Sequence, residues 1–255
     1  MTPDWSPLRT ELALWDKAGL NLPLWWRDDD AVQPTAQLDH LTAMAERFQI
    51  PVHLAVIPSP ASLKLANAIR KTDHLIPVVH GWTHQSHAPK GQKKAEFGAH
   101  RPVADMLAEA TQSFDRMKTL FGTRLRPMFV PPWNRISGDL PAGLADIGYT
   151  SLSTFAPRRH SHAAKGLARI NTHLDPINWR GNRSLVDPGT LIHQITRMLQ
   201  DRRTGAADNG EPFGLLTHHL VHDADIWAFT QAILTEFQRG PVLIWTHPDQ
   251  AETPT

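Results

Sequence analysis

Three consecutive aspartates, Asp28 to Asp30, follow an apolar run (LPLWW) that is typical of a buried strand. Carboxylates this close repel one another, and burying them unpaired is costly. Two histidines four residues apart, His80 and His84, follow a second apolar run (LIPVV). Two histidines and one carboxylate can hold a divalent cation with positions open for water and substrate, and a neighbouring carboxylate can take a proton. Such a cation, with nearby arginines, would hold the aspartates together.

Each of these features has a less specific explanation when it is taken alone. An HxxxH spacing is a weak signal in a chain with 15 histidines, and a run of aspartates is often a solvated turn. His218, next to His219 and close to His222, could be one of several surface histidines. A catalytic site is favoured because polar residues of these kinds follow one predicted strand after another.

The elements that must position these residues alternate between strand and helix along the chain. Apolar runs predict strands, and apolar residues at helical spacing predict helices. The predicted strands are 22–26, 51–57, 75–79, 127–130, 150–154, 213–218 and 241–245. The predicted helices are 6–17, 35–49, 61–71, 103–121, 137–147, 188–203 and 223–239, and loops with a brief strand fill 155–185. Short connections between such elements predict βα units in a parallel sheet, and the number of units favours an α/β barrel. We expect residues 1–255 to form one domain, with a helical extension at 1–20.

In a parallel barrel, all strands end at one rim, where the active sites of such folds lie. Polar residues follow five of the predicted strands: Asp28–Asp30, His80 with His84, Pro131–Asn134, His218 with His219, and His247. We therefore predict a single site at the mouth of the barrel.

Composition narrows the classes of function further. The chain has no cysteine, so any metal must be held by His, Asp or Glu. A net charge of +1 with interspersed acids and bases argues against nucleic acid or an anionic membrane as the main partner. No apolar run approaches the ~20 residues of a membrane span. The first twenty residues lack the pattern of a secretory signal, so a soluble, cytoplasmic protein is expected.

These motifs and their order resemble those of the polysaccharide deacetylases, carbohydrate esterase family 4 and its divergent relatives. RDDDA is similar to the first family motif, with Asp29 as the base and Asp30 as a metal ligand. HGWTH is similar to the second motif, with His80 and His84 as the other ligands. The resemblance implies a distorted (β/α) barrel of about seven strands and a divalent metal, most often Zn²⁺.

Two later motifs concern the general acid. LLTH resembles the fifth family motif, with His218 as the acid. DPINW resembles the fourth, with Asp175 and Trp179, and Asp175 would hold His218 protonated and oriented.

VPPW resembles the third motif, except that Val130 stands where the family has an arginine that orients the base. Arg27 or Arg135 would take its place, since both lie near the right strand ends. The residues expected to bind substrate are Trp133, Asn134, Trp179 and Arg27.

The resemblance implies a metal-dependent hydrolase that removes an N- or O-acetyl group from a carbohydrate or a related small substrate. In the mechanism that the resemblance implies, a water activated by the metal would attack the acetyl carbonyl, Asp29 would take its proton, and His218 would protonate the leaving group, which would give a bell-shaped pH profile. Three alternatives remain open. The chain could be another metal-dependent barrel hydrolase or isomerase, a glycosidase that uses Asp29 without metal, or a sugar-binding relative without turnover. HGWTH argues against the glycosidase, and the missing arginine favours the binding protein.

Overall fold

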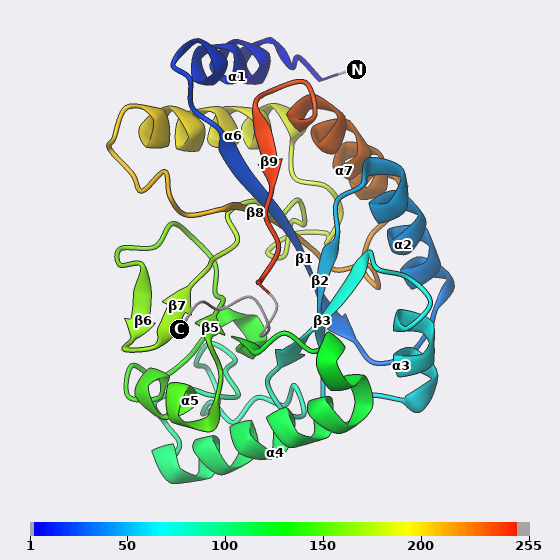
Figure 1. Cartoon of the computed structure of the whole chain (residues 1–255), viewed down its shortest axis with the longest axis vertical. Coiled ribbons are helices and arrows are strands. Elements are labelled where there is room, and N and C mark those ends of the chain that lie inside the picture. Colours follow the sequence, from blue (N-terminus) through cyan, green and yellow to red (C-terminus); the bar gives the residue numbers. More distant parts are fainter. Residues whose placement is uncertain (1–2, 249–255) are drawn as a thin grey trace.

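Strands and helices alternate in a computed structural model of the chain, which describes residues 3–248 (Figure 1). The strands are β1 (Leu22–Ala31), β2 (Val52–Val56), β3 (Leu75–His80), β4 (Met128–Val130), β5 (Ser151–Leu152), β6 (His162–Ala164), β7 (Leu167–Arg169), β8 (Phe213–Thr217) and β9 (Val242–Ile244). The helices are α1 (Ser6–Lys17), α2 (Ala36–Phe48), α3 (Leu63–Ile69), α4 (Val103–Phe121), α5 (Pro141–Ile147), α6 (Pro188–Arg203) and α7 (Ala224–Phe237). Two short 3₁₀ turns are η1 (Gly122–Arg124) and η2 (Pro132–Asn134).

The sheet has the order β6-β7-β5-β4-β3-β2-β1-β8, and all neighbours are parallel except β6 and β7. The chain after β7 closes the ring, because Leu174 forms a parallel bridge with Leu215 of β8. Leu216 N donates to Leu174 O at 2.8 Å across the same junction. The predicted distorted barrel of about seven parallel strands is therefore confirmed.

The antiparallel β6 is an addition to this barrel, and β9, the strand predicted at 241–245, lies outside the ring and pairs with the start of β1. The prediction that His247 lies at the mouth with the other strand ends is therefore wrong, because His247 contacts His53 near the start of β2 and Thr150 before β5.

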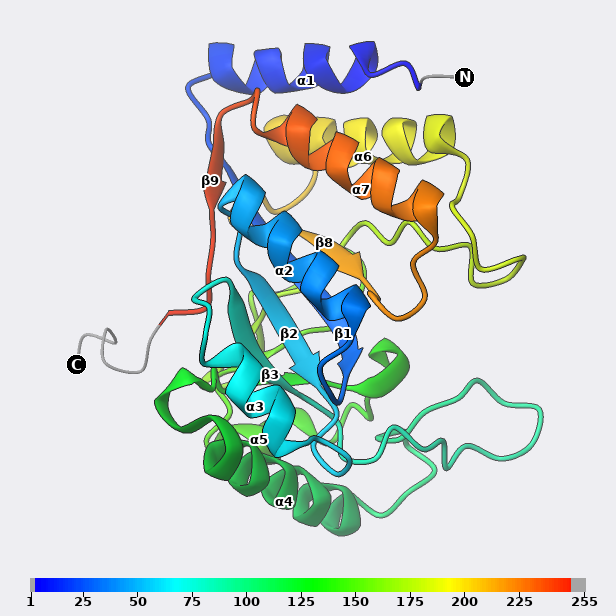
Figure 2. The same cartoon turned by 90° about the vertical axis from the view of Figure 1, so that its right-hand side faces the viewer.

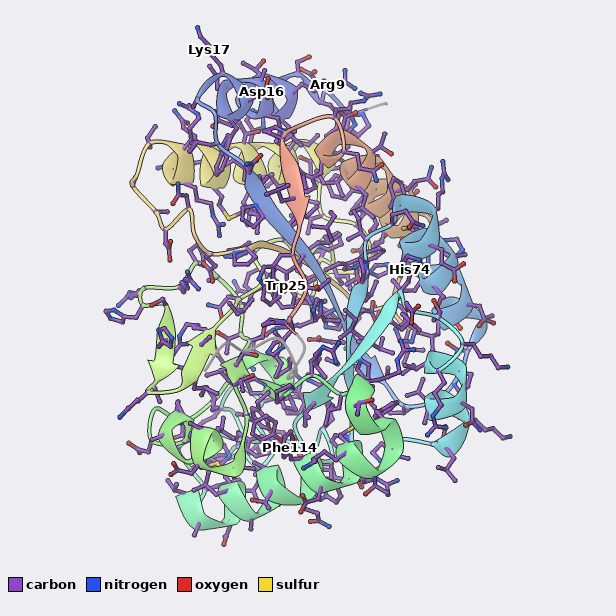
Figure 3. The ribbon with its side chains drawn as sticks, in the orientation of Figure 1. Arg9, Asp16, Lys17, Trp25, His74 and Phe114 are labelled. Carbon is purple, nitrogen blue, oxygen red and sulfur yellow. The ribbon has the colours of Figure 1, made fainter. Side chains whose placement is uncertain are left out.

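Side-chain alternation along β1 separates two packing layers. Leu22, Leu24 and Trp26 belong to the large core that packs the strands against the helices. Trp25 belongs to a smaller cluster inside the ring, with residues of β2, β3 and β4, and lies near the centre of the molecule (Figure 3). The same alternation continues beyond Trp25, so Arg27 and Asp29 also face the inside of the barrel.

One boundary differs from the prediction in a way that affects the site. The strand predicted at 22–26 continues to Ala31, so the aspartates lie within β1 and not after it. Asp28 pairs with Leu54 of β2 and with Thr217 of β8, and this pairing on both edges keeps the polar residues in the strand. The local sequence could not predict this, because aspartate is depleted in strands and the strands that pair with β1 were unknown.

α1 lies across α6 and α7, on the opposite side of the barrel from α4 (Figure 2). The Trp15 indole is fully buried there and donates to Leu199 O at 3.2 Å. Ion pairs join Arg9 to Glu236 and Arg203 to Glu11. Within residues 3–248, no helix combines the length and the apolar composition that a membrane span requires.

Candidate active site

The three aspartates of β1 face three different environments. Asp29 faces the interior of the barrel, and Asp28 faces the outer layer because successive residues of a strand alternate. Asp30 has a left-handed φ of 76°, and the pairing of β1 with β2 shifts register between Asp28 and Ala31. An irregularity of this kind re-aims a side chain. It turns the Asp30 carboxylate toward His80 and His84.

Asp30, His80 and His84 form a group that we call the candidate metal centre. Asp30 Oδ1 lies 3.1 Å from His80 Nε2 and 3.2 Å from His84 Nε2, and the three donor atoms lie within 4.8 Å of one another. For a tetrahedral zinc ion with bonds of about 2.0–2.1 Å, neighbouring ligand atoms are about 3.3 Å apart. The two distances from the carboxylate oxygen to the imidazole nitrogens therefore suit a small divalent cation.

The hydrogen bonds of His80 also fit the binding of a cation. His80 Nδ1 donates to Val130 O at 3.0 Å, since a carbonyl can only accept. In the neutral ring, Nε2 then directs a lone pair at Asp30 Oδ1, a contact that needs a proton or a cation between the two atoms. A backbone carbonyl that orients the far nitrogen in this way is typical of histidine ligands.

The pKa values of the donors are shifted as expected if a proton lies between Asp30 and His80, where a cation would otherwise lie. Burial alone would lower the pKa of His80, but Asp29 and the bond with Asp30 raise it above its usual value. Burial alone would raise the pKa of Asp30, but the bond and charge of His80 lower it well below its usual range. Burial lowers the pKa of His84, so this ring is neutral and can act as a ligand at neutral pH.

Asp29 is held by Arg27 in a buried, bidentate ion pair. Arg27 Nε and Nη2 lie 2.9 and 3.0 Å from the two Asp29 carboxylate oxygens, and the arginine side chain is completely buried. Arg27 also donates to Ser153 Oγ and to Asn134 Oδ1, both at 2.7 Å. Arg135 instead donates to Lys94 O at 2.6 Å. Of the two arginines considered from the sequence, Arg27 is thus the one that contacts Asp29.

His218 follows β8 directly, and its Nε2 lies 4.0 Å from Asp29 Oδ2. The Trp179 ring packs edge-on against His218 at 4.8 Å between centroids. Asp175 accepts hydrogen bonds from Trp179 Nε1 at 2.7 Å and from Ile177 N at 3.0 Å. Among the described residues, no hydrogen bond joins Asp175 to His218, and Trp179 links the two, since it donates to Asp175 and packs against the His218 ring. Burial raises the pKa of Asp175, and the charge of His218 opposes this shift.

The neighbouring histidines face elsewhere. His219 is completely buried, and its Nδ1 forms a short hydrogen bond with Asp28 in the outer layer. His222 packs against Trp227 with ring centroids 4.4 Å apart, and its Nε2 accepts from His218 N at 3.3 Å. Of the three candidates, His218 is the one directed at Asp29.

Asp28 is a site residue to which the sequence alone assigned no role. Its carboxylate accepts from Thr217 Oγ1 at 2.6 Å, from His219 N at 3.0 Å and from the His219 ring. Thr217 and His219 flank His218, so Asp28 fixes the segment that carries the candidate acid. Burial alone would raise the pKa of Asp28, but His219 and Thr217 lower it, which keeps the carboxylate ionised.

Trp133 and Asn134 lie in η2, beyond the end of β4, and both have left-handed φ values, of 56° and 55°. The Trp133 ring lies 4.4 Å from the His84 ring. Trp133 therefore lies beside the candidate metal centre, and Trp179 lies beside His218.

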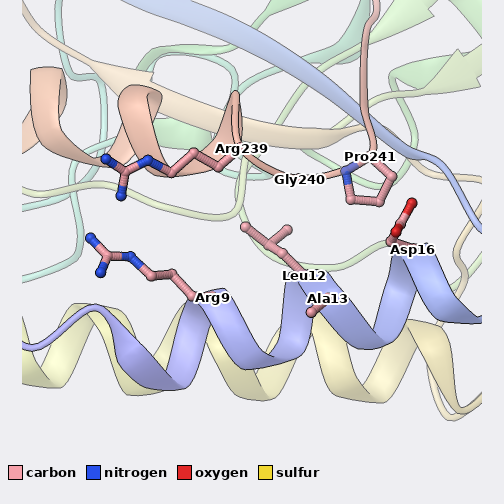
Figure 4. Close-up of a pocket in the computed structure, with 7 residues that line it drawn as sticks. All are labelled: Arg9, Leu12, Ala13, Asp16, Arg239, Gly240 and Pro241. Carbon is pink, nitrogen blue, oxygen red and sulfur yellow. The ribbon is translucent and has the colours of Figure 1, made fainter.

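A surface pocket between α1 and the turn before β9 is separate from these residues (Figure 4). Arg9 and Arg239 both bind Glu236 there, so its main charges are already paired. The sticks in Figure 4 include none of the residues predicted for the site.

Comparison of the sequence finds no matching family model and no matching curated protein. Comparison of structures finds a protein from Mycobacterium smegmatis described as a polysaccharide deacetylase, with a TM-score of 0.61 and 16% identity over 83% of this chain and 74% of that one. A family 4 carbohydrate esterase from Streptomyces lividans, in complex with acetate, matches with a TM-score of 0.56 and 12% identity over 89% and 93% of the two chains. A peptidoglycan deacetylase from Bacillus subtilis matches with a TM-score of 0.52 and 15% identity over 88% and 87%. At these identities, the likeness establishes the fold, which is that of the polysaccharide deacetylases.

Proposed function

We propose that this protein is a divergent polysaccharide deacetylase, a metal-dependent hydrolase that removes an acetyl group from a carbohydrate. The observation that carries the proposal is the convergence of Asp30, His80 and His84 beside the arginine-held Asp29. Solved proteins of the same fold support it, since they include carbohydrate and peptidoglycan deacetylases. The chain lacks an arginine at Val130, but Arg27 contacts Asp29 directly, so that absence no longer favours a protein without turnover.

Asp30, His80 and His84 would hold the divalent cation, and zinc is the first candidate for a site of two imidazoles and one carboxylate. When bound, the cation would supply Lewis acidity that polarises an acetyl carbonyl and makes a water molecule more acidic. The remaining chemistry falls to side chains of the barrel mouth.

Asp29 is placed to take the proton of the attacking water. Its bidentate ion pair with Arg27 would fix the orientation of the carboxylate, and a base must be held within reach of the proton that it takes. His218, with Nε2 4.0 Å from Asp29, would donate a proton to the leaving nitrogen or oxygen. The proton taken by Asp29 would then pass to His218, directly or by exchange with solvent, so that both residues end in their starting states.

Three further residues would bind the substrate. The Trp133 backbone N–H donates no hydrogen bond within the described residues and would stabilise the developing oxyanion. The rings of Trp133 and Trp179 would enclose the methyl group, and Asn134, which is bound to Arg27, would contact the sugar.

Acetate release from a panel of acetylated carbohydrates tests this function. The panel contains N-acetylglucosamine oligomers, O-acetylated xylo-oligosaccharides and small N-acetylated sugars. We expect zinc-loaded protein to release acetate from at least one class, chelation to abolish release, and added Zn²⁺ to restore it. Binding without acetate release would favour a sugar-binding protein, and new reducing ends without acetate would favour a glycosidase.

The role of His218 gives a second test on the same substrate. His218→Ala should lower turnover of an unactivated amide by about 10²–10⁴ and remove the decline of the rate at high pH. An activated ester should lose far less, because its leaving group needs little protonation. His222→Ala is the comparison, since the His222 ring packs on Trp227 and meets His218 only at its backbone N–H among the described residues, so it should change turnover much less. If His222→Ala carried the larger loss, the acid would have to be reassigned.

A further inference from the structure

The loop between β3 and α4, residues 81–102, extends from the side of the barrel toward which β1 and β2 point (Figure 2). Part of this loop folds back against the barrel and buries the side chain of Glu96 completely. A buried carboxylate needs hydrogen-bond donors or a positive charge. The donors that bind Glu96 identify what it does.

The Glu96 carboxylate binds the turn between the two histidines of the metal centre. Glu96 Oε1 accepts from Thr83 N and from Thr83 Oγ1, both at 2.7 Å. Glu96 Oε2 accepts from Trp82 N at 3.2 Å. Bonds to an ionised acceptor are roughly twice as strong as neutral ones. Glu96 thereby fixes both residues that immediately precede His84.

Gly81 provides the space for this carboxylate. It has a φ of 58°, and a Cβ built on it would lie only 2.3 Å from Glu96 Oε2 and 2.5 Å from Pro132 Cδ. A larger residue at this position would therefore displace the carboxylate or the proline. The glycine of HGWTH and the distant Glu96 form one structural unit.

Glu96 is itself anchored on both sides. Its neighbour Phe97 forms a parallel bridge with Ile136, and Ser137 N donates to Phe97 O at 2.7 Å. Arg101 Nη1 donates to Glu96 O at 3.1 Å, and the same guanidinium binds Glu109. The carboxylate thus has a fixed position from which to hold the turn.

We propose that Glu96 is a positioning residue for the cation, which sets the conformation of the 80–84 turn so that His84 reaches the metal centre. This inference rests on the proposed function, because it requires a cation at Asp30, His80 and His84. His84 has a left-handed φ of 59°, a conformation that a β-carbon disfavours and that its surroundings must maintain. Without the carboxylate, two backbone N–H groups lose their acceptor and the turn relaxes, which withdraws one ligand.

Metal affinity of Glu96→Gln tests the proposal. The glutamine keeps the size of the side chain but presents an NH₂ group to one of the N–H donors. Removing an outer-shell partner typically costs 10–100-fold in metal affinity, and we expect a loss of about this size for Zn²⁺ in competition titrations. The visible spectrum of the Co²⁺-loaded variant should also change, which a purely structural role at a distance would not cause. Thr83→Val, which removes one of the three bonds, should show a smaller loss in the same direction.

Glu109→Gln is the matched control, because it makes the same change of side chain next to the loop, while its side-chain oxygen still accepts from Arg101, so that the Arg101 bond to Glu96 O and the turn stay in place. Its Zn²⁺ affinity and Co²⁺ spectrum should equal those of the wild type. If the wild type bound no divalent cation, the proposed function would fail. If the wild type bound zinc and folded Glu96→Gln bound it equally well with the same Co²⁺ spectrum, only the role of Glu96 would be refuted. An equal loss of Zn²⁺ affinity in Glu109→Gln would also refute it, because the loss would then come from a general loss of order in the loop and not from the bonds of the Glu96 carboxylate.

Discussion

Replacing both histidines of the candidate metal centre, by His80→Ala together with His84→Ala, is expected to leave the protein without bound zinc and without measurable turnover. Asp30 would remain as the single ligand, too few to hold a cation against dialysis. A bound metal supplies several kcal/mol of transition-state stabilisation. At about 1.4 kcal/mol per tenfold, the rate should fall by at least ~10³. Metal content after zinc loading and acetate release from the best substrate measure the two effects.

His193→Ala is a suitable control, since His193 is exposed on α6 and the single hydrogen bond of its ring among residues 3–248 is to Gly189 O. It should keep the metal content and turnover of the wild type. The double variant removes a buried imidazole, so its far-UV circular dichroism must show a folded chain before the metal content is interpreted. A folded double variant with unchanged zinc stoichiometry would contradict the assignment of the ligands.

The sequence predicted the barrel and the meeting of Asp30, His80 and His84 for a simple physical reason. Apolar runs alternate with helical patterns, and parallel strands bring their ends to one rim, so residues far apart in sequence were expected together. His80 and His84 meet Asp30 as this geometry requires. The role of each aspartate was harder to predict, because it depends on the alternation of side chains along β1 and on the register shift near its end. The sequence pattern ended that strand at residue 26, before the aspartates.

The choice between Arg27 and Arg135 as the partner of Asp29 could have been narrowed from the sequence. Arg27 lies two residues before Asp29, and residues two apart face the same side of a strand, so an extended β1 places them together. Arg135 lies in a segment without a pattern, and only the structure shows that it binds Lys94 O.

Other contacts left no signal in the sequence. Asp28 meets His219 across 191 residues, and Glu96 comes from a long loop without periodicity. Such contacts follow from packing, because buried carboxylates must find donors wherever the fold supplies them.

Asp29→Asn should abolish turnover and leave zinc in place, because the variant loses the base but no metal ligand. A positioned base contributes about 10²–10⁴ in rate, and we expect a loss near the upper end. No other aspartate of β1 can replace it, since Asp28 is bound to Thr217 and His219 in the outer layer and Asp30 faces the histidine ligands. Acetate release and zinc content of the same preparation measure both parts of the prediction.

Two comparisons separate the loss of a base from other effects of Asp29→Asn. The change leaves Arg27 buried without its carboxylate, and breaking a buried ion pair from one side costs about 3–5 kcal/mol, so assays must be run well below the unfolding temperature of the variant. The side-chain oxygens of Ser153 and Asn134 still accept from the guanidinium, which favours a variant that folds. Asp30→Asn is the reciprocal variant and should lose zinc together with turnover. If Asp29→Asn lost the metal while Asp30→Asn kept it, the two aspartates would exchange roles, and β1 would present its carboxylates to the cation one residue earlier.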